Sequence, residues 1–321
     1  MKRSLALLLI ALWSGPVLAQ ADYPNRPVRV IAPFPPGQGT ELIARAVAAQ
    51  LTVQMGQNFF VENRPGAAGI IGTEAVKNAA PDGYTLLVAG GGPFAINMAM
   101  YAKLPYDTLR DFQPIGMIAA VPNVLVVSND FPATNVKELL AHAAKQGEKL
   151  NYASSGVGVP NHLIMEMLKS AAGLKMTHVP YKGAAASIAA LISGEIGLMF
   201  ETPGAIVPHI RSGRVRALAV SSAQRSVALP DLPTIAEAGG PKGFGAQGWS
   251  ALAAPAATPT AVVQKLYSEL KTALARPDMK KRLLDIGVDP LDFTFEQTAT
   301  YFRSEVENWA KAVKSAGIKP E

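Results

Sequence analysis

Apolar and polar positions recur with two different periods along the chain, and the changes of period mark the predicted elements. Short apolar or β-branched runs predict strands, and apolar residues three or four positions apart predict helices. The first series has strands at 28–32, 59–62 and 85–89 and helices at 40–55 and 74–78. The apolar face of its first helix is formed by Leu42, Ile43, Ala46, Val47 and Leu51. This βαβαβ order predicts a largely parallel sheet.

A second series of the same kind begins near residue 124 and predicts a second α/β unit. Its strands are expected at 124–127, 150–153, 178–181, 196–200 and 215–220, and its helices at 136–145, 161–172, 187–192 and near 207. The helix at 161–172 is strongly periodic, with an apolar stripe of Leu163, Ile164, Met167, Leu168 and Ala171.

Two further apolar runs have the length and position of strands that join the two units. Residues 113–121 lead from the first unit to the second, residues 249–254 lead back, and helices follow at 260–275, 278–286 and 295–315. We therefore predict two doubly wound α/β lobes joined by a two-strand hinge, with a ligand cleft between them. The expected boundaries are 20–120 plus 250–321 for lobe one and 121–249 for lobe two.

Residues 1–19 have a separate interpretation. Lys2 and Arg3 precede an apolar run at 5–13, and Ala19 ends the stretch. This pattern is typical of a secretory signal peptide cleaved after Ala19, and it predicts a periplasmic protein. An uncleaved membrane anchor is the alternative, although the apolar run is shorter than the ~20 residues that span a bilayer.

Composition excludes several chemistries. The 321 residues include no Cys, which rules out disulfides, thiolate metal sites and a cysteine nucleophile. The formal net charge is +6, but the densest basic stretch, 271–282, has no interleaved aromatic residue, so we expect no nucleic-acid binding. The four His residues show no metal-ligand spacing. We expect a monomer with no metal and no cofactor.

Loops rich in glycine or polar residues follow six of the predicted strands. They lie at 33–41, 63–72, 90–93, 154–158, 181–183 and 201–204. A helix N-terminus presents unpaired N–H groups to an anion, and glycine permits close backbone approach, so doubly wound sheets would bring these loops to one cleft. Neither GxGxxG nor GxxxxGK[ST] occurs, so no nucleotide loop is predicted. Taken singly, each loop is better explained as an ordinary strand-to-helix turn.

Several motifs, in this order, resemble one family. They are PFPPG at 33–37, VENRPGAAG at 61–69, APDGYTL at 80–86, VPYKG at 179–183, RALAV at 216–220 and LPTIAEAG at 232–239. The set is similar to the Bug-type substrate-binding receptors of tripartite tricarboxylate transporters, and the likeness covers nearly all of the chain after residue 19. The resemblance implies a type II periplasmic binding fold that closes over a small organic carboxylate and delivers it to membrane permease subunits.

The resemblance also implies a set of ligand-binding residues. Such receptors hold the carboxylate mainly with backbone amides and ordered water, which carries over to Pro36, Gly37, Gly39, Thr40, Ala67 and Ala68 of lobe one. The opposite lobe would supply Ser154, Ser155, Gly158, Asn161, His162 and Tyr181. The same set of loops adds Phe34, Gly92, Glu201 and Thr202.

Three positions depart from the family pattern. Gln38 stands where a second adjacent Gly is usual, and Glu41 stands where Asp is usual, so the first loop can be positioned differently. Val159 stands where Ser or Thr is common, which removes a hydroxyl from the far side of the pocket. We therefore expect a less polar distal pocket, suited to a monocarboxylate, a longer dicarboxylate or an aromatic acid.

Some of the polar residues also have structural interpretations. His162, in the first turn of an amphipathic helix, suits a cap or a structural hydrogen bond as well as a ligand contact. Lys182, Arg45 and Arg64 suit surface positions or ion pairs. Trp249 is expected to pack within the hinge strand rather than to stack on a ligand.

Two other functions would use the same region. A secreted hydrolase would need a nucleophile and a base, and Ser154 or Ser155 with His162 is the nearby pair. No GxSxG motif occurs, so we expect no enzyme. A receptor that docks on a membrane sensor kinase would use the same pocket, and the sequence does not separate it from a transport receptor.

Overall fold

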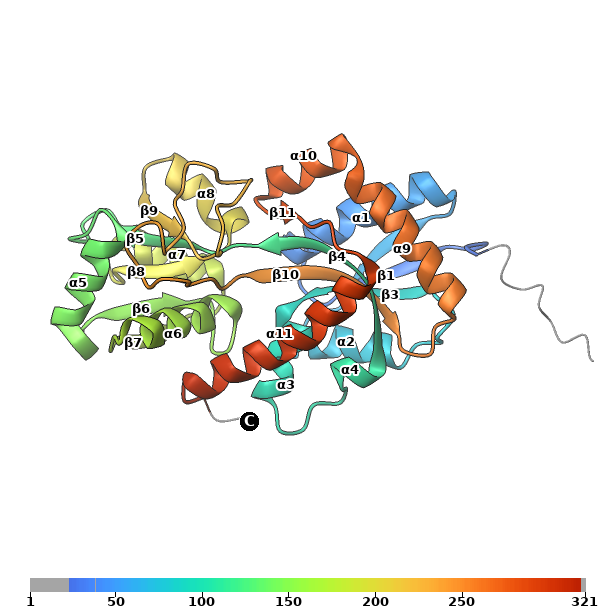
Figure 1. Ribbon diagram of the computed structural model, residues 1–321, viewed down its shortest axis with the longest axis horizontal. Coiled ribbons are helices and arrows are strands. Elements are labelled where there is room, and N and C mark those ends of the chain that lie inside the picture. The colour runs from blue at the N-terminus through green and yellow to red at the C-terminus, as the bar shows by residue number, and fades with distance from the viewer. Residues whose placement is uncertain (1–22, 38, 319–321) are drawn as a thin grey trace, which may run out of the picture.

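The computed structural model describes residues 23–37 and 39–318, so the predicted signal peptide at 1–19 lies outside the described residues. Two mixed sheets form the cores of two lobes, joined where long strands pass between them (Figure 1). We call the elements around the six-stranded sheet lobe one and those around the five-stranded sheet lobe two. In the described part of the chain, no helix combines the length and apolar character needed to cross a membrane.

The sheet of lobe one has the strand order β11-β4-β10-β3-β1-β2. Its strands are β1 Val28–Ala32, β2 Phe59–Asn63, β3 Thr85–Gly90, β4 Phe112–Val121, β10 Gly248–Pro255 and β11 Asp289–Pro290. Strands β1, β2 and β3 are parallel, but β10 pairs antiparallel with both β3 and β4. The largely parallel sheet predicted from sequence is therefore corrected to a mixed one, because the returning strand enters between β3 and β4.

The sheet of lobe two has the order β7-β6-β8-β5-β9. Its strands are β5 Val124–Ser128, β6 Asn151–Ser154, β7 Thr177–Pro180, β8 Leu198–Glu201 and β9 Val215–Val220. Here β6, β7 and β8 are parallel, whereas β5 is antiparallel to β8 and β9. Each lobe thus has three parallel strands whose carboxyl ends lie at one edge of its sheet.

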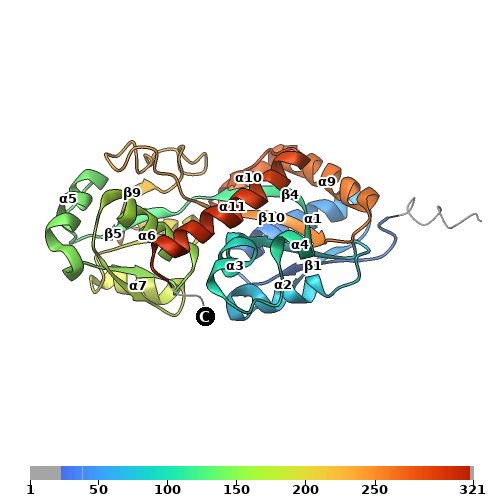
Figure 2. The same cartoon turned by 60° about the horizontal axis from the view of Figure 1, so that its bottom comes forward.

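The helices cover the faces of both sheets, and α11 crosses from one lobe to the other (Figures 1 and 2). Lobe one carries α1 Gly39–Met55, α2 Ile70–Lys77, α3 Asn97–Met100, α4 Thr108–Asp111, α9 Thr260–Ala275, α10 Pro277–Ile286 and α11 Phe295–Ser315. Lobe two carries α5 Val136–Gln146, α6 Pro160–Ala172, α7 Ala184–Ser193 and α8 Pro203–Arg211.

Two predicted helix faces need correction. In α1, Ile43, Val47 and Leu51 are buried as expected, but Leu42 is 37% exposed because it lies at the border of the apolar face. In α6, Leu163, Ile164 and Leu168 are buried, together with the unpredicted Met165, whereas Met167 and Ala171 line a cavity.

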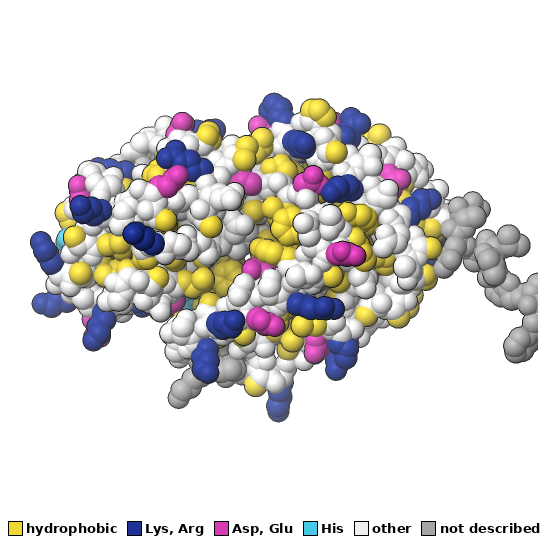
Figure 3. Space-filling model, in the orientation of Figure 1, with side chains coloured by type: hydrophobic (Ala, Val, Ile, Leu, Met, Phe, Trp, Pro, Cys, Tyr) yellow, Lys and Arg dark blue, Asp and Glu magenta, His cyan; other side chains and the backbone are white. Residues whose placement is uncertain are grey.

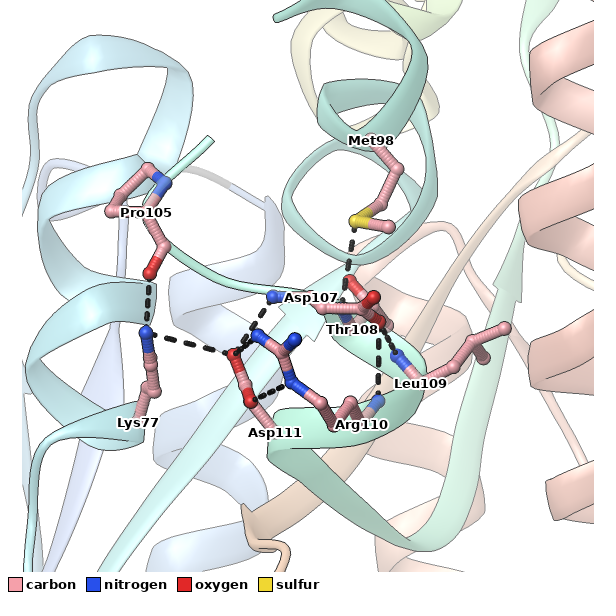
Figure 4. Close-up of polar contacts among 8 residues, drawn as sticks. All are labelled: Lys77, Met98, Pro105, Asp107, Thr108, Leu109, Arg110 and Asp111. Carbon is pink, nitrogen blue, oxygen red and sulfur yellow. Dashed lines mark hydrogen bonds and ion pairs between the residues drawn. The ribbon is translucent and has the colours of Figure 1, made fainter. Parts of the chain in front are cut away.

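The segment between β3 and β4 was not resolved into elements by the sequence pattern, and side-chain contacts explain its conformation (Figure 4). Asp107 caps α4 by accepting from the N–H groups of Leu109 and Arg110, at 2.9 and 3.1 Å. Asp111 accepts from the N–H of Asp107 at 2.8 Å and pairs with Lys77 of α2 at 3.6 Å. These contacts hold the connection against α2.

Candidate functional site

The first three predicted loops of lobe one meet at a single glycine. A Cβ added at Gly69 would lie 2.9 Å from Cγ of Pro93, 3.4 Å from Cβ of Pro33 and 3.6 Å from the ring of Phe34. The loops after β1, β2 and β3 therefore converge, as parallel strands predict. Only a residue without a Cβ permits this approach.

The loop after β2 has an unusual backbone. Four consecutive residues at 66–69 have positive φ, including Ala67 at 45° and Ala68 at 52°. A left-handed conformation costs an alanine roughly 1–2 kcal/mol, and such strain is concentrated at functional sites. Asn97 Nδ2 donates to the carbonyl of Ala68 at 3.1 Å, which helps to hold the conformation. Runs of this kind aim successive N–H groups into anion-binding concavities.

Glu41 organises the first loop. Its side chain is buried, accepts from the N–H of Gly37 at 3.0 Å and pairs with Arg45. Arg45 also donates to Asn63 Oδ1 of the second loop at 3.4 Å. The departure from the family pattern at Glu41 therefore places a carboxylate on one of the N–H groups expected to face a ligand.

The other predicted residues of lobe one lie at the start of helical turns. Pro36 and Gly39 are exposed and Thr40 is half-buried, and because α1 begins at Gly39, Thr40 lies inside its first turn. Gly92 begins a π-helical turn at Gly92–Ile96. Gln38 lies outside the described residues.

In lobe two, four predicted residues bind one another around a buried carboxylate. Glu201 accepts from the N–H of Thr202 at 2.8 Å, from its hydroxyl at 3.1 Å, and from Asn161 Nδ2 at 3.2 Å. Asn161 Nδ2 also donates to Ser155 Oγ at 2.6 Å. Burial raises the pKa of Glu201, and hydrogen bonds from Thr202, Asn161 and Ser155 partly oppose that shift. We call Glu201, Thr202, Asn161 and Ser155 the Glu201 cluster.

A second group of residues in lobe two, around Ser154, tests whether the site has the nucleophile that a hydrolase needs. The pair considered for a hydrolase was Ser154 or Ser155 with His162, but Ser154 Oγ lies 2.6 Å from Nε2 of His178. Ser154 also donates to the carbonyl of Gly156 at 2.7 Å. A hydroxyl has one proton, so a Ser154 that donates to Gly156 leaves His178 as the donor of their contact. Ser154 is also fully buried. The arrangement fixes the loop and supplies no activated nucleophile.

His162 has the structural role that the sequence offered as one interpretation. Its ring stacks on His178 with centroids 3.8 Å apart, and Nδ1 accepts from the N–H of Gly158 at 3.0 Å. Burial, and next the charge of His178, lower the pKa of His162 to about 3. Tyr181, also predicted to touch ligand, directs its hydroxyl to Glu195 at 2.7 Å.

One contact joins a predicted loop of lobe two to lobe one. A Cβ added at Gly158, which has a φ of 74°, would lie 2.6 Å from Cε of Met100 at the end of α3. The predicted loop of lobe two therefore touches lobe one directly. Met100 was not among the predicted residues, because its segment shows no interpretable periodicity.

The structure also has a cavity of about 650 Å³ that none of the predicted residues line. It lies between α6, α11 and residues 245–247, and its lining includes Met167, Gln247, Glu305 and Trp309. The face drawn in Figure 3 is hollowed between the two lobes, where apolar side chains gather. Trp249 is buried within β10, as expected for a hinge strand.

Comparison with known proteins identifies the family. The model of the tripartite tricarboxylate transporter family receptors matches residues 43–318, most of the chain. The chain belongs to this family. The receptor is 34% identical to the protein BugT of Bordetella pertussis over 323 residues, with 99% of each chain covered.

Solved structures agree with the two-lobed fold of the receptor. A protein of R. palustris solved with adipate is 35% identical, with a TM-score of 0.84 over 94% of this chain and 100% of the other. The periplasmic binding protein BugD is 36% identical, with a TM-score of 0.79 over 93% and 100% of the two chains. The family and these neighbours are solute-binding proteins, not enzymes.

Proposed function

We propose that this receptor binds a small organic carboxylate between its lobes and delivers it to the membrane permease of a tripartite tricarboxylate transporter. The observation that carries the proposal is the left-handed run at 66–69, which lies where the loops of lobe one converge. Backbone N–H groups at such a turn bind an anion without a buried cationic partner. The relative solved with adipate supports a carboxylate as the ligand.

We further propose lobe boundaries at 20–120 plus 250–321 and at 121–249, with export directed by residues 1–19. The assignment of strands to the two sheets supports this division. The sixteen predicted ligand residues remain the proposed site. Within it, Pro36, Gly39, Ala67 and Ala68 are exposed and available to a ligand, whereas the Glu201 cluster supports the opposite wall from behind.

Calorimetric titration with adipate, malate, citrate, benzoate and the neutral diamide of adipic acid tests the proposal. Saturable binding of at least one acid is expected, with a higher melting temperature because a ligand of the native state stabilises it. The diamide should not bind. No detectable binding of any of the acids, or equal binding of adipate and its diamide, would contradict carboxylate recognition.

Delivery needs a separate experiment. The exported receptor, cross-linked in cells that carry the permease, should be recovered with a permease subunit, and more of it when the bound acid is supplied. Recovery with a sensor kinase ectodomain instead would favour the alternative partner.

A further inference from the structure

Two tryptophans from distant parts of the chain share one carboxylate oxygen. Trp249 Nε1 on β10 and Trp309 Nε1 on α11 both donate to Glu305 Oε2, at 2.7 and 3.0 Å. We call Glu305, Trp249 and Trp309 the indole cluster. Both indoles are nearly inaccessible, at 2% and 4% exposed.

The chemistry of the cluster depends on the charge of Glu305. An indole N–H is a donor only, so each buried indole needs an acceptor. An ionised oxygen accepts two such bonds more strongly than a neutral amide oxygen does. Burial raises the pKa of Glu305, and the hydrogen bonds from Trp249, Asn308 and Trp309 oppose that shift.

The two indole rings of the cluster lie close to the third loop of lobe one. A Cβ added at Gly91 would lie 3.3 Å from Trp249 Nε1 and 3.4 Å from Trp309 Nε1. Gly91 precedes Gly92, one of the proposed ligand residues, and Gly90 pairs with Ser250 in the adjacent strand. The position of the two ring nitrogens therefore fixes how closely residues 90–92 approach β10.

The cluster also stands at the junction of the lobes. Trp249 is the second residue of β10, the strand that returns from lobe two. Gln247, the residue just before β10, lines the cavity together with Glu305 and Trp309. Helix α11 contacts α6 of lobe two as well as β4 and α3 of lobe one. A displacement of α6 relative to α11 would therefore affect the side chains of the indole cluster, which hold loop 90–92.

We propose that Glu305 is a positioning residue, which holds loop 90–92 in its ligand-binding conformation through the indoles of Trp249 and Trp309. The inference rests on the proposed function only for the effect on ligand affinity. The effect on the loop itself is independent of any ligand.

Fluorescence isolates the cluster, because the three tryptophans of the chain are Trp13, Trp249 and Trp309. With Trp13→Phe in every version of the full chain, the emission arises from the cluster alone. Glu305→Gln keeps the shape and one oxygen, Glu305→Ala removes the acceptor, and Glu307→Ala is the matched control at an exposed position of the same helix. Gly91→Ala perturbs the contact from the loop side.

Hydrogen exchange of residues 90–96 in the ligand-free protein is the first readout. Exchange should be at least about fivefold faster in Glu305→Ala than in Glu307→Ala, with Glu305→Gln in between, while the urea midpoint of global unfolding changes less. Gly91→Ala should shift the tryptophan emission. Equal exchange in Glu305→Ala and Glu307→Ala would overturn the proposal, and Glu305→Gln decides it if the alanine variant does not fold.

Adipate binding is the second readout. In Trp13→Phe protein, adipate should change the emission, and Glu305→Ala should weaken adipate binding about fivefold or more, within the usual range of coupling between sites. Glu305→Gln keeps the shape of the side chain but replaces the charged acceptor by a neutral one, so it should recover only part of the loss, whereas a role in packing alone would let it recover all of it. If the parent protein binds no carboxylate, the proposed function fails, whereas the exchange experiment still decides the role of Glu305.

Discussion

The two walls of the proposed cleft are built in different ways. The wall of lobe one is backbone: glycines and alanines at 66–69 in left-handed conformations, with side chains such as Glu41 and Asn97 holding the turns from behind. The wall of lobe two is backed by polar side chains that bind one another, above all the Glu201 cluster. The proposed ligand contacts and their structural support are thus divided differently in the two lobes.

This difference teaches which substitutions each wall tolerates. A backbone wall depends on conformation, so a residue that adopts the same φ preserves it. A wall of mutually bonded side chains depends on identity, because removal of one member leaves the others buried without partners.

The largest effect is expected from Glu201→Ala. It leaves the N–H and the hydroxyl of Thr202 without their acceptor and removes one of the two acceptors of Asn161 Nδ2, which should lower the free energy of unfolding by about 3 kcal/mol. Glu201→Gln, which keeps one acceptor oxygen, should cost roughly half as much. Urea unfolding measures both. The control is Glu148→Ala, at an exposed position of the same lobe, which should change stability by less than ~0.5 kcal/mol. Equal effects of Glu201→Ala and Glu148→Ala would contradict the proposed difference between the walls.

Substitutions at Ala68 test the opposite wall. A β-branched side chain is strained at a φ of 52°, so Ala68→Val should lower the free energy of unfolding by about 1–2 kcal/mol and weaken adipate binding. Ala68→Gly should stay within ~1 kcal/mol of the parent, because relief of strain offsets the greater entropy of the unfolded chain. Calorimetry and urea unfolding give the two quantities. A valine variant that matches the glycine variant in both would show that backbone conformation is not what this wall requires.

A smaller and pH-dependent effect is expected at His162. Its folded pKa of about 3 lies below the unfolded value of ~6.5, so the unfolded chain binds more protons between these values and stability falls as the pH is lowered through that window. His162→Asn keeps an acceptor for Gly158 but does not titrate. Between pH 6.5 and 5 it should lose about 1.5 kcal/mol less stability than the parent. Urea unfolding at a series of pH values checks the slope, and parallel curves for the two proteins would contradict the assignment.

The elements were largely predictable because each carries its own local pattern. The predicted strands at 28–32 and 215–220 and the helices at 260–275 and 295–315 coincide with β1, β9, α9 and α11. The hinge strands were predictable too. A long apolar run between two complete α/β units must be buried, and a strand that links the two sheets is the simplest way to bury it. The segment between β3 and β4 was missed because its turns are fixed by contacts such as Lys77 with Asp111, which have no period.

The site was predictable only in outline. Glycines and strand ends located the loops. The histidine beside Ser154, however, is His178, twenty-four residues away on the next strand, and the sequence offered only His162 as a nearby histidine. Glu201 accepts hydrogen bonds from Asn161 and Thr202, and Gly158 contacts Met100. The bond from Asn161 and the contact with Met100 likewise join residues that are distant in the sequence and meet only in the folded protein. The spacing of residues along the chain does not show which hydrogen-bond donors contact a buried carboxylate in the folded protein.

The place of β10 in the first sheet has a consequence for the order in which the molecule is assembled. Lobe two takes all its strands from one continuous stretch, residues 124–220, so its sheet can form as soon as that stretch is available. The sheet of lobe one lacks the strand between β3 and β4 until residues 248–255 arrive, and long-range pairing of this kind generally forms slowly. The lobe that begins the chain is therefore the last to be completed.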